Sequence, residues 1–158
     1  VLNTTVLKNN IIQLLKIGIT DISINTHYLK EKIIDYIKTE FDFPINISIE
    51  EEKILGVGGG IGRMKKYFAG DDVLVINGDV LNNFDLKLLT DFYYKEKPFA
   101  ALGLYNYPKV NSVLIDDENN IYDFKNLIRF PDLGIFIPSA TRRILFFIRI
   151  SGKLVKTH

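Results

Sequence analysis

The chain has 158 residues, 47% hydrophobic and 25% charged, which is the balance of a globular protein with one core. A formal net charge of +1 selects neither nucleic acid nor an anionic membrane as a partner, so we expect neither. The absence of cysteine excludes disulfides, thiolate catalysis and cysteine-ligated zinc. No apolar run reaches the roughly 20 residues of a membrane span, and no signal pattern opens the chain, so we expect a cytoplasmic protein.

The first third of the chain alternates between helical and strand patterns. The predicted elements are helices over residues 5–17 and 28–41 and strands over residues 22–25 and 45–49. We expect Asn3 or Thr4 to cap the first helix and Gly18 to end it. An acidic run, residues 50–52, follows the second strand and is predicted to be a solvated turn, unless one of its carboxylates faces a site.

A glycine cluster comes next, with five glycines within residues 56–62 and a short helix predicted over residues 61–68. Glycine lets a base, ribose or phosphate lie against the backbone, and amides that open into a helix can bind an anion. The alternative is a flexible turn, although five clustered glycines cost much conformational entropy for a turn alone. Arg63, Lys65 and Lys66 are predicted to form the solvated face of the short helix.

A continuous apolar run over residues 72–77 is typical of a strand buried on both faces of a parallel sheet. It ends in Asn77-Gly78-Asp79. The glycine permits a sharp turn, and a carboxylate at the mouth of such a sheet can hold Mg²⁺ against phosphate oxygens. The alternative is local, with Asp79 capping the turn and Asn77 bonding to the nearby backbone.

The rest of the chain carries further strand and turn signals. The predicted elements are a helix capped by Asp85 and running to about residue 95, a strand over residues 99–105, a hairpin of residues 113–115 and 121–124 with an exposed acidic tip, and a strand over residues 133–137. Residues 142–158 give no clear assignment.

Strands that alternate with crossover helices predict one α/β domain over residues 1–158 with a mostly parallel sheet. Ligands of such sheets bind beyond the carboxyl ends of the strands, where the glycine cluster and Asp79 are expected. A dinucleotide-binding module is an alternative, since Gly56, Gly58 and Gly62 fit a glycine motif of that class and Asp79 stands where its ribose-binding acid would lie. The residues between the strand and the glycines argue against it.

Taken together, the glycine segment of residues 51–61 and the strand and turn of residues 73–80 resemble the sugar-1-phosphate nucleotidyltransferase family. The nearest pattern is that of the mannose-1-phosphate guanylyltransferases, heptose-1-phosphate guanylyltransferases and N-acetylmuramate-1-phosphate uridylyltransferases. The resemblance continues in residues 16–29, 117–124 and 133–136, and covers roughly residues 1–140.

The resemblance implies a Rossmann-like fold and an enzyme that joins a sugar 1-phosphate to a nucleoside triphosphate and releases pyrophosphate. It implies that Asp79 is the catalytic residue and the ligand of Mg²⁺. The residues that it places at the nucleotide are Gly56, Gly58, Gly59, Asn77 and Gly78.

The chain also departs from the family pattern. The phosphate-gripping glycine loop, the lysine after it and the first strand would all precede Val1, so we expect a truncated domain that is inactive alone. A gap is expected between the strands at Ile22 and Val73, which favours a homo-oligomer. Val57 stands where the family usually has threonine, and the chain stops before the family's second metal-binding acid would appear. A non-catalytic nucleotide-sugar-binding or regulatory domain of the same fold is therefore the alternative function.

Overall fold

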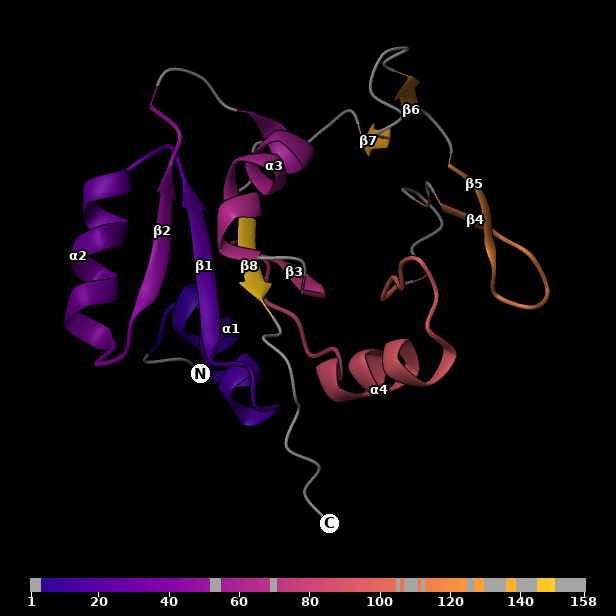
Figure 1. Cartoon of the computed structure of the whole chain (residues 1–158), viewed down its shortest axis with the longest axis horizontal. Coiled ribbons are helices and arrows are strands. Elements are labelled where there is room, and N and C mark those ends of the chain that lie inside the picture. The colour runs from indigo at the N-terminus through magenta and orange to yellow at the C-terminus, as the bar shows by residue number, and fades with distance from the viewer. Residues whose placement is uncertain are drawn as a thin grey trace.

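The computed structural model describes residues 4–51, 55–68, 71–104, 106, 111 and 113–124, and the backbone of three further strands. The helices are α1 (Val6–Lys16), α2 (Lys30–Glu40), α3 (Gly56–Phe68) and α4 (Leu86–Glu96). The strands are β1 (Asp21–Thr26), β2 (Ile45–Ile49), β3 (Val73–Asn77), β4 (Val113–Ile115), β5 (Ile121–Phe124), β6 (Leu127–Arg129), β7 (Phe136–Pro138) and β8 (Leu145–Arg149). Figure 1 shows helices flanking a central sheet, which confirms the predicted α/β class.

The main sheet has the strand order β2-β1-β8-β3. Strands β1 and β2 are parallel, and β8 is antiparallel to both β1 and β3, so β1, β2 and β3 all run in one direction. The gap expected between the first and third of these strands is therefore filled. The strand that fills it comes from residues for which the sequence pattern gave no assignment, and its direction makes the sheet mixed at its centre.

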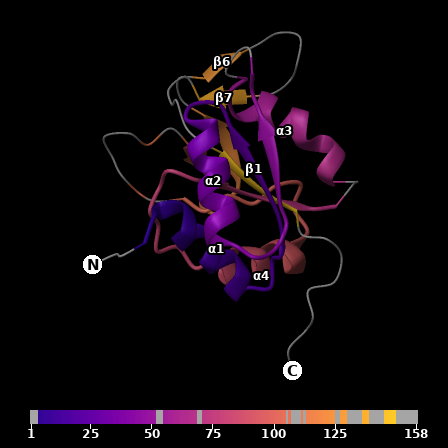
Figure 2. The ribbon, with the colours of Figure 1, turned by 90° about the vertical axis from the view of Figure 1, so that its left-hand side faces the viewer.

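The two faces of the sheet differ in polarity, because side chains alternate along each strand. Ile22 and Ile24 of β1 belong to one face and are fully buried in an apolar core with residues of α1, α2 and α4. Ser23 and Asn25 belong to the other face, which α3 covers. Figure 2 shows α2 and α3 on opposite sides of β1. Polar side chains of β1 therefore lie under the glycine-rich α3, beside the buried apolar side chains of Met64 and Phe68 of that helix.

The ends of α1 follow elementary capping rules. Thr5 is the N-cap, and its hydroxyl oxygen accepts a hydrogen bond from the Lys8 amide at 3.1 Å. The predicted cap at Thr4 is therefore wrong by one residue, and Asn3 lies outside the described residues. Gly18 ends the helix as predicted, with a φ of 83° that costs glycine little. No described helix is long and apolar enough to cross a membrane.

Strand β3 is less covered than its sequence predicts. Val75 is 40% exposed, although Leu74 and Ile76 lie in the core. The reason is that α3 packs over β1, β2 and β8 and reaches β3 only at Val73. The prediction of burial on both faces is therefore wrong for this strand, whose only described neighbour in the sheet is β8.

The predicted strand over residues 99–105 does not form in its described part, residues 99–104. These residues lie across a cavity of about 1050 Å³ from β3 and α4 and make no strand ladder with them. Phe99 is fully exposed, and Gly103 stands close to the ring of Phe84. The strand propensity of this segment is overridden because no backbone partner is within reach.

The predicted hairpin is confirmed as β4 and β5. Its exposed tip is organised by Asp116, whose carboxylate accepts hydrogen bonds from the amides of Glu118 and Asn120 at 3.0 and 2.8 Å. The hydrogen bonds from Asn120 hold the pKa of Asp116 below its ordinary value. Strand β7 overlaps the end of the strand predicted over residues 133–137, of which residues 133–135 lie outside the described residues.

Because β8 is the element that joins β1 to β3, its removal is expected to destroy the sheet. A chain that stops after residue 144 should lose cooperative thermal unfolding, and a chain that stops after residue 150 should keep it. Circular dichroism melts of the two chains check this, with light scattering to detect association through the exposed strand edges. Equal cooperative transitions in both chains would contradict a structural role of β8.

Candidate functional site

The carboxyl ends of β1, β2 and β3 form one edge of the sheet. Ile24 of β1 and Ile76 of β3 both pair with Phe146 of β8, so Asn25 and Asn77 stand in the next row at that edge. Neighbouring strands are about 4.8 Å apart, which places the two asparagine backbones roughly 10 Å from each other across β8. Asn25 of β1 and Asn77, the first residue of the Asn77-Gly78-Asp79 turn, therefore stand at the same edge, at a separation that a nucleotide can span.

Glu50, the first residue after β2, is a buried acid at this edge, with 3% of its surface exposed. Its Oε1 accepts a hydrogen bond from Asn25 Nδ2 at 2.8 Å, and its Oε2 accepts one from the Leu55 amide at 2.9 Å. The main-chain oxygen of Glu50 accepts a third, from His27 Nδ1, at 2.6 Å. The Asn25 and Leu55 donors replace water around the carboxylate.

The predicted solvated acidic turn is therefore wrong for Glu50 and holds for Glu51, which is exposed; Glu52 lies outside the described residues. Glu50 is instead buried at the sheet edge, and the expectation that one acid of the run faces a site stays a prediction. His27 is a loop residue, as the sequence indicated, and its ring ties the end of β1 to the residue after β2.

The glycine cluster forms the first two turns of α3, so the predicted loop with a helix from Ile61 is wrong. Tertiary packing overrides the low helix propensity of glycine here. A Cβ at Gly60 would lie 2.8 Å from Asn25 Nδ2 and 3.3 Å from Glu50 Oε1. A Cβ at Gly59 would lie 2.7 Å from the Cβ of Leu55. Glycine at these positions lets α3 close onto the buried Asn25–Glu50 pair.

The other glycines have different roles. Gly56 has a φ of 70°, the left-handed conformation that favours glycine at the entry to the helix. Gly58 is half-buried in the first turns of α3, and a Cβ at Gly62 would meet open space. The dinucleotide motif of Gly56, Gly58 and Gly62 thus lies within a helix that residues 50–55 separate from β2.

The Asn77-Gly78-Asp79 turn is held from the opposite face of the sheet by α1. Asn10 is 1% exposed, and its Nδ2 donates to the main-chain oxygens of Asn77 at 3.3 Å and Val80 at 3.2 Å. The Val80 amide closes the turn on Asn77 at 3.4 Å. The turn is therefore fixed through its backbone, and α1 determines where it presents Asp79.

Asp79 is exposed, and its carboxylate has no hydrogen bond or ion pair with any described residue. No cluster of three or more acids or histidines gathers into a metal site in the described part of the chain. Mg²⁺ is bound in many phosphate-handling sites by one or two carboxylates together with substrate oxygens and water. An unengaged carboxylate on a fixed turn fits that donor set, so Asp79 is the residue that would hold the ion.

Several buried polar atoms near this edge have no partner among the described residues. They are Asn10 Oδ1, Ser23 Oγ, Asn25 Oδ1 and Thr26 Oγ1. Buried polar atoms are rarely left unpaired in folded proteins, and those that are unpaired concentrate where water, an ion or a ligand completes them. Asn25 and Thr26 are the last two residues of β1, and Asn10 bonds to the turn after β3, so three of the four atoms lie near this edge.

Sequence reasoning missed Asn10 and Asn25, and it singled out neither Glu50 within its acidic run nor Gly60 within its glycine cluster. The signal for Asn25 was the alternation of polar and apolar residues in β1, which indicates a polar layer on one face of the strand. Asn10 gave no local signal, because its partners are 67 and 70 residues away in sequence.

The fold is that of the α/β domains, a class whose ligands bind at the carboxyl ends of parallel strands. By sequence, the chain is a relative of the sugar-1-phosphate nucleotidyltransferases, which confirms the resemblance. It is 35% identical over 98 residues to the bifunctional protein GlmU of Methanocaldococcus jannaschii, covering 62% of this chain and 22% of that protein.

Two further relatives carry the family reaction in their names. A mannose-1-phosphate guanylyltransferase of Mycobacterium tuberculosis is 39% identical over 56 residues, which are 35% of this chain and 16% of that enzyme. A D-glycero-alpha-D-manno-heptose 1-phosphate guanylyltransferase of Campylobacter jejuni is 32% identical over 115 residues, which are 72% of this chain and 50% of that enzyme. The chain thus spans half or less of the curated relatives it matches. No family model and no solved structure gives a significant match.

Replacing Gly60 by alanine tests the packing of α3 on the buried pair. The new methyl group would meet Asn25 at 2.8 Å, so Gly60→Ala is expected to lower the free energy of unfolding by about 1–3 kcal/mol. Gly62→Ala is the matched control, expected to be neutral or stabilising by up to about 1 kcal/mol because alanine favours a helix. Urea denaturation measures both, and equal effects would contradict the close contact.

Removing the Asn10 amide tests how the Asp79 turn is held. Asn10→Ala leaves the oxygens of Asn77 and Val80 without this donor, so a loss of about 1–3 kcal/mol in unfolding free energy is expected. Hydrogen exchange should also quicken at Val80, whose amide closes the turn. Asn9→Ala is the control on the same helix. Unchanged exchange at Val80 in Asn10→Ala would show that the turn does not depend on α1.

Proposed function

We propose that this chain supplies the nucleotide- and metal-binding part of an enzyme that joins a sugar 1-phosphate to a nucleoside triphosphate. The proposal rests on the shared row of Asn25, on which Gly60 of α3 packs, and Asn77, whose turn carries the exposed, unengaged carboxylate of Asp79. The names of the relatives support the same reaction class.

The chemistry assigns a role to each part of the edge. In the reaction, an oxygen of the sugar phosphate forms a bond to the α-phosphorus of the triphosphate, the bond to the β-phosphate oxygen breaks, and pyrophosphate leaves. Bound Mg²⁺ would supply the positive charge that such a transfer requires on the phosphate oxygens. Asp79 would hold that ion, and Asn10 would keep Asp79 in place by fixing the backbone of its turn.

The nucleotide has a matching surface on α3. Gly58 and Gly59 carry no side chain, so a base or ribose can approach the backbone of the first turns of the helix. We assign Gly56 to the entry of that surface, and Asn77 and Gly78 to the wall beside Asp79. The Asn25–Glu50 hydrogen bond lies under the same helix and would hold it against the sheet.

The test is ligand-dependent thermal unfolding of the 158-residue chain with Mg²⁺ and each nucleoside triphosphate in turn. One triphosphate should raise the melting temperature in a Mg²⁺-dependent way, because a ligand that binds the folded state stabilises it. Asp79→Asn should abolish that shift. Asp117→Asn, at the exposed hairpin tip, is the control and should keep it.

The outcomes separate binding from catalysis. A shift that survives Asp79→Asn, or that ignores Mg²⁺, would contradict the assigned metal ligand. Release of pyrophosphate in the presence of mannose 1-phosphate would show turnover. A Mg²⁺-dependent shift without pyrophosphate release would instead favour the non-catalytic nucleotide-sugar-binding role.

A further inference from the structure

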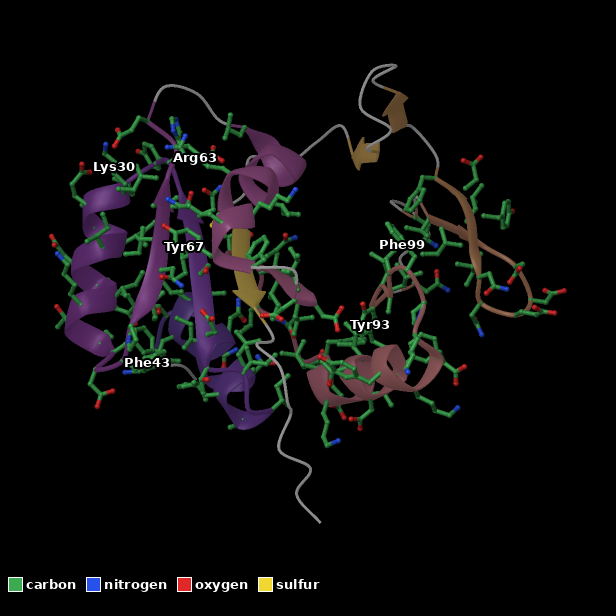
Figure 3. The ribbon with its side chains drawn as sticks, in the orientation of Figure 1. Lys30, Phe43, Arg63, Tyr67, Tyr93 and Phe99 are labelled. Atoms are coloured by element: carbon green, nitrogen blue, oxygen red, sulfur yellow. The ribbon has the colours of Figure 1, made fainter. Side chains whose placement is uncertain are left out.

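A second cavity lies between α3 and β2, the outermost described strand of the main sheet on the side away from β3. Its volume is about 210 Å³, and it is lined by residues 47–49 of β2, by Glu51, and by Arg63, Lys66 and Tyr67 of α3. Figure 3 shows Arg63 and Tyr67 on the side of α3 that faces β2. Three strand spacings separate β2 from β3, so this cavity is roughly 14 Å across the sheet from the strand that carries Asp79.

The charges around this cavity are unbalanced. The carboxylate of Glu51 is engaged in an ion pair with Lys30 of α2, which neutralises it. Arg63 and Lys66 have no ion pair with any acid in the described ranges, and the Lys66 ammonium lies 4.9 Å from the centre of the Tyr67 ring. The cavity therefore carries two cationic groups that lack a counter-ion among these residues.

The predicted solvated face of α3 thus divides into two parts. Arg63, Lys65 and Lys66 are all exposed, as the sequence indicated, but only the first and third line the cavity. Arg63 and Lys66 are three residues apart and therefore lie on one side of the helix, whereas Lys65 lies on a different side. Because β2 forms the facing wall of the cavity, Arg63 and Lys66 line a concave site and not an open helix surface.

We propose that this cavity binds a single tetrahedral oxyanion, namely inorganic phosphate or the phosphate group of a small phosphomonoester. The planar guanidinium of Arg63 can donate two parallel hydrogen bonds to such a group, and Lys66 adds a second positive charge. The volume is below the roughly 300 Å³ at which whole-ligand pockets begin, so the cavity takes one phosphate group and excludes a nucleotide. This site is separate from the proposed nucleotide site and does not rest on it.

The test is a titration of the 158-residue chain with inorganic phosphate at constant ionic strength, followed by amide NMR. Saturable shifts are expected at residues 47–49 and 63–67. Arg63→Gln and Lys66→Gln should each weaken the affinity about tenfold, the effect of losing one charge-assisted hydrogen bond. Lys65→Gln, the matched control, should stay within about twofold of the original chain, and Asp79→Asn should leave the phosphate affinity unchanged.

Two further arms identify the ligand. Glucose 1-phosphate that shifts the same amides would show that the site accepts a phosphomonoester, and phosphate alone would restrict it to the free ion. The proposal is overturned if chloride produces the same shifts, if the shifts rise linearly without saturation, or if Lys65→Gln weakens binding as much as Arg63→Gln. A phosphate titration that moves amides only around residues 77–80 also overturns it, while leaving the proposed nucleotide site intact.

Discussion

The buried hydrogen bond between Asn25 and Glu50 is the constraint on which the arrangement of the site depends. A carboxylate that is 3% exposed needs donors in place of water, and Asn25 and the Leu55 amide provide them. This pair occupies the space where a side chain on α3 would otherwise pack. The helix above it therefore carries glycine at Gly60, while Met64 and Phe68 further along α3 bury their side chains in a cluster that includes Val73. Glycine also leaves the backbone at the start of the helix uncovered by side chains, so a ligand can approach it.

The two faces of the sheet have different roles, one in stability and the other in the proposed chemistry. The apolar face, with Ile22 and Ile24, forms the core with α1, α2 and α4. From that face Asn10 reaches to the sheet edge and fixes the turn that presents Asp79. The polar face carries the buried pair and the unpartnered Ser23 Oγ and Asn25 Oδ1. A site at this edge is thus supported by the apolar core on one face of the sheet and by α3 on the other. Strand β8 joins β1 to β3 between them.

The sequence predicted most local elements, because their signals are local. The periodicity of β2 and the Asp85 cap at α4 were read from neighbouring residues, and both are confirmed. The glycine helix was missed because its stability comes from contacts with Asn25 and Glu50. Glu50 lies several residues before the helix in sequence, and Asn25 lies before the whole of α2. The position of β8 was missed for a similar reason, since its ladder partners Ile24 and Ile76 are far away in the chain. The rule on strand ends predicts that the start of α3 and the Asp79 turn lie near one edge of the sheet, whereas the hydrogen bonds from Asn10 that hold the turn required the structure.

The central claim is that the start of α3 and the Asp79 turn form one nucleotide site. Paramagnetic broadening by Mn²⁺ in place of Mg²⁺ measures this most directly, because the effect falls off steeply with distance from the ion. With the metal and a nucleoside triphosphate added to the isotope-labelled chain, our account predicts broadening of the amides at residues 78–80 together with those at residues 58–60. Broadening confined to the acidic tip at residues 116–120, or absent from the first turns of α3, would contradict it.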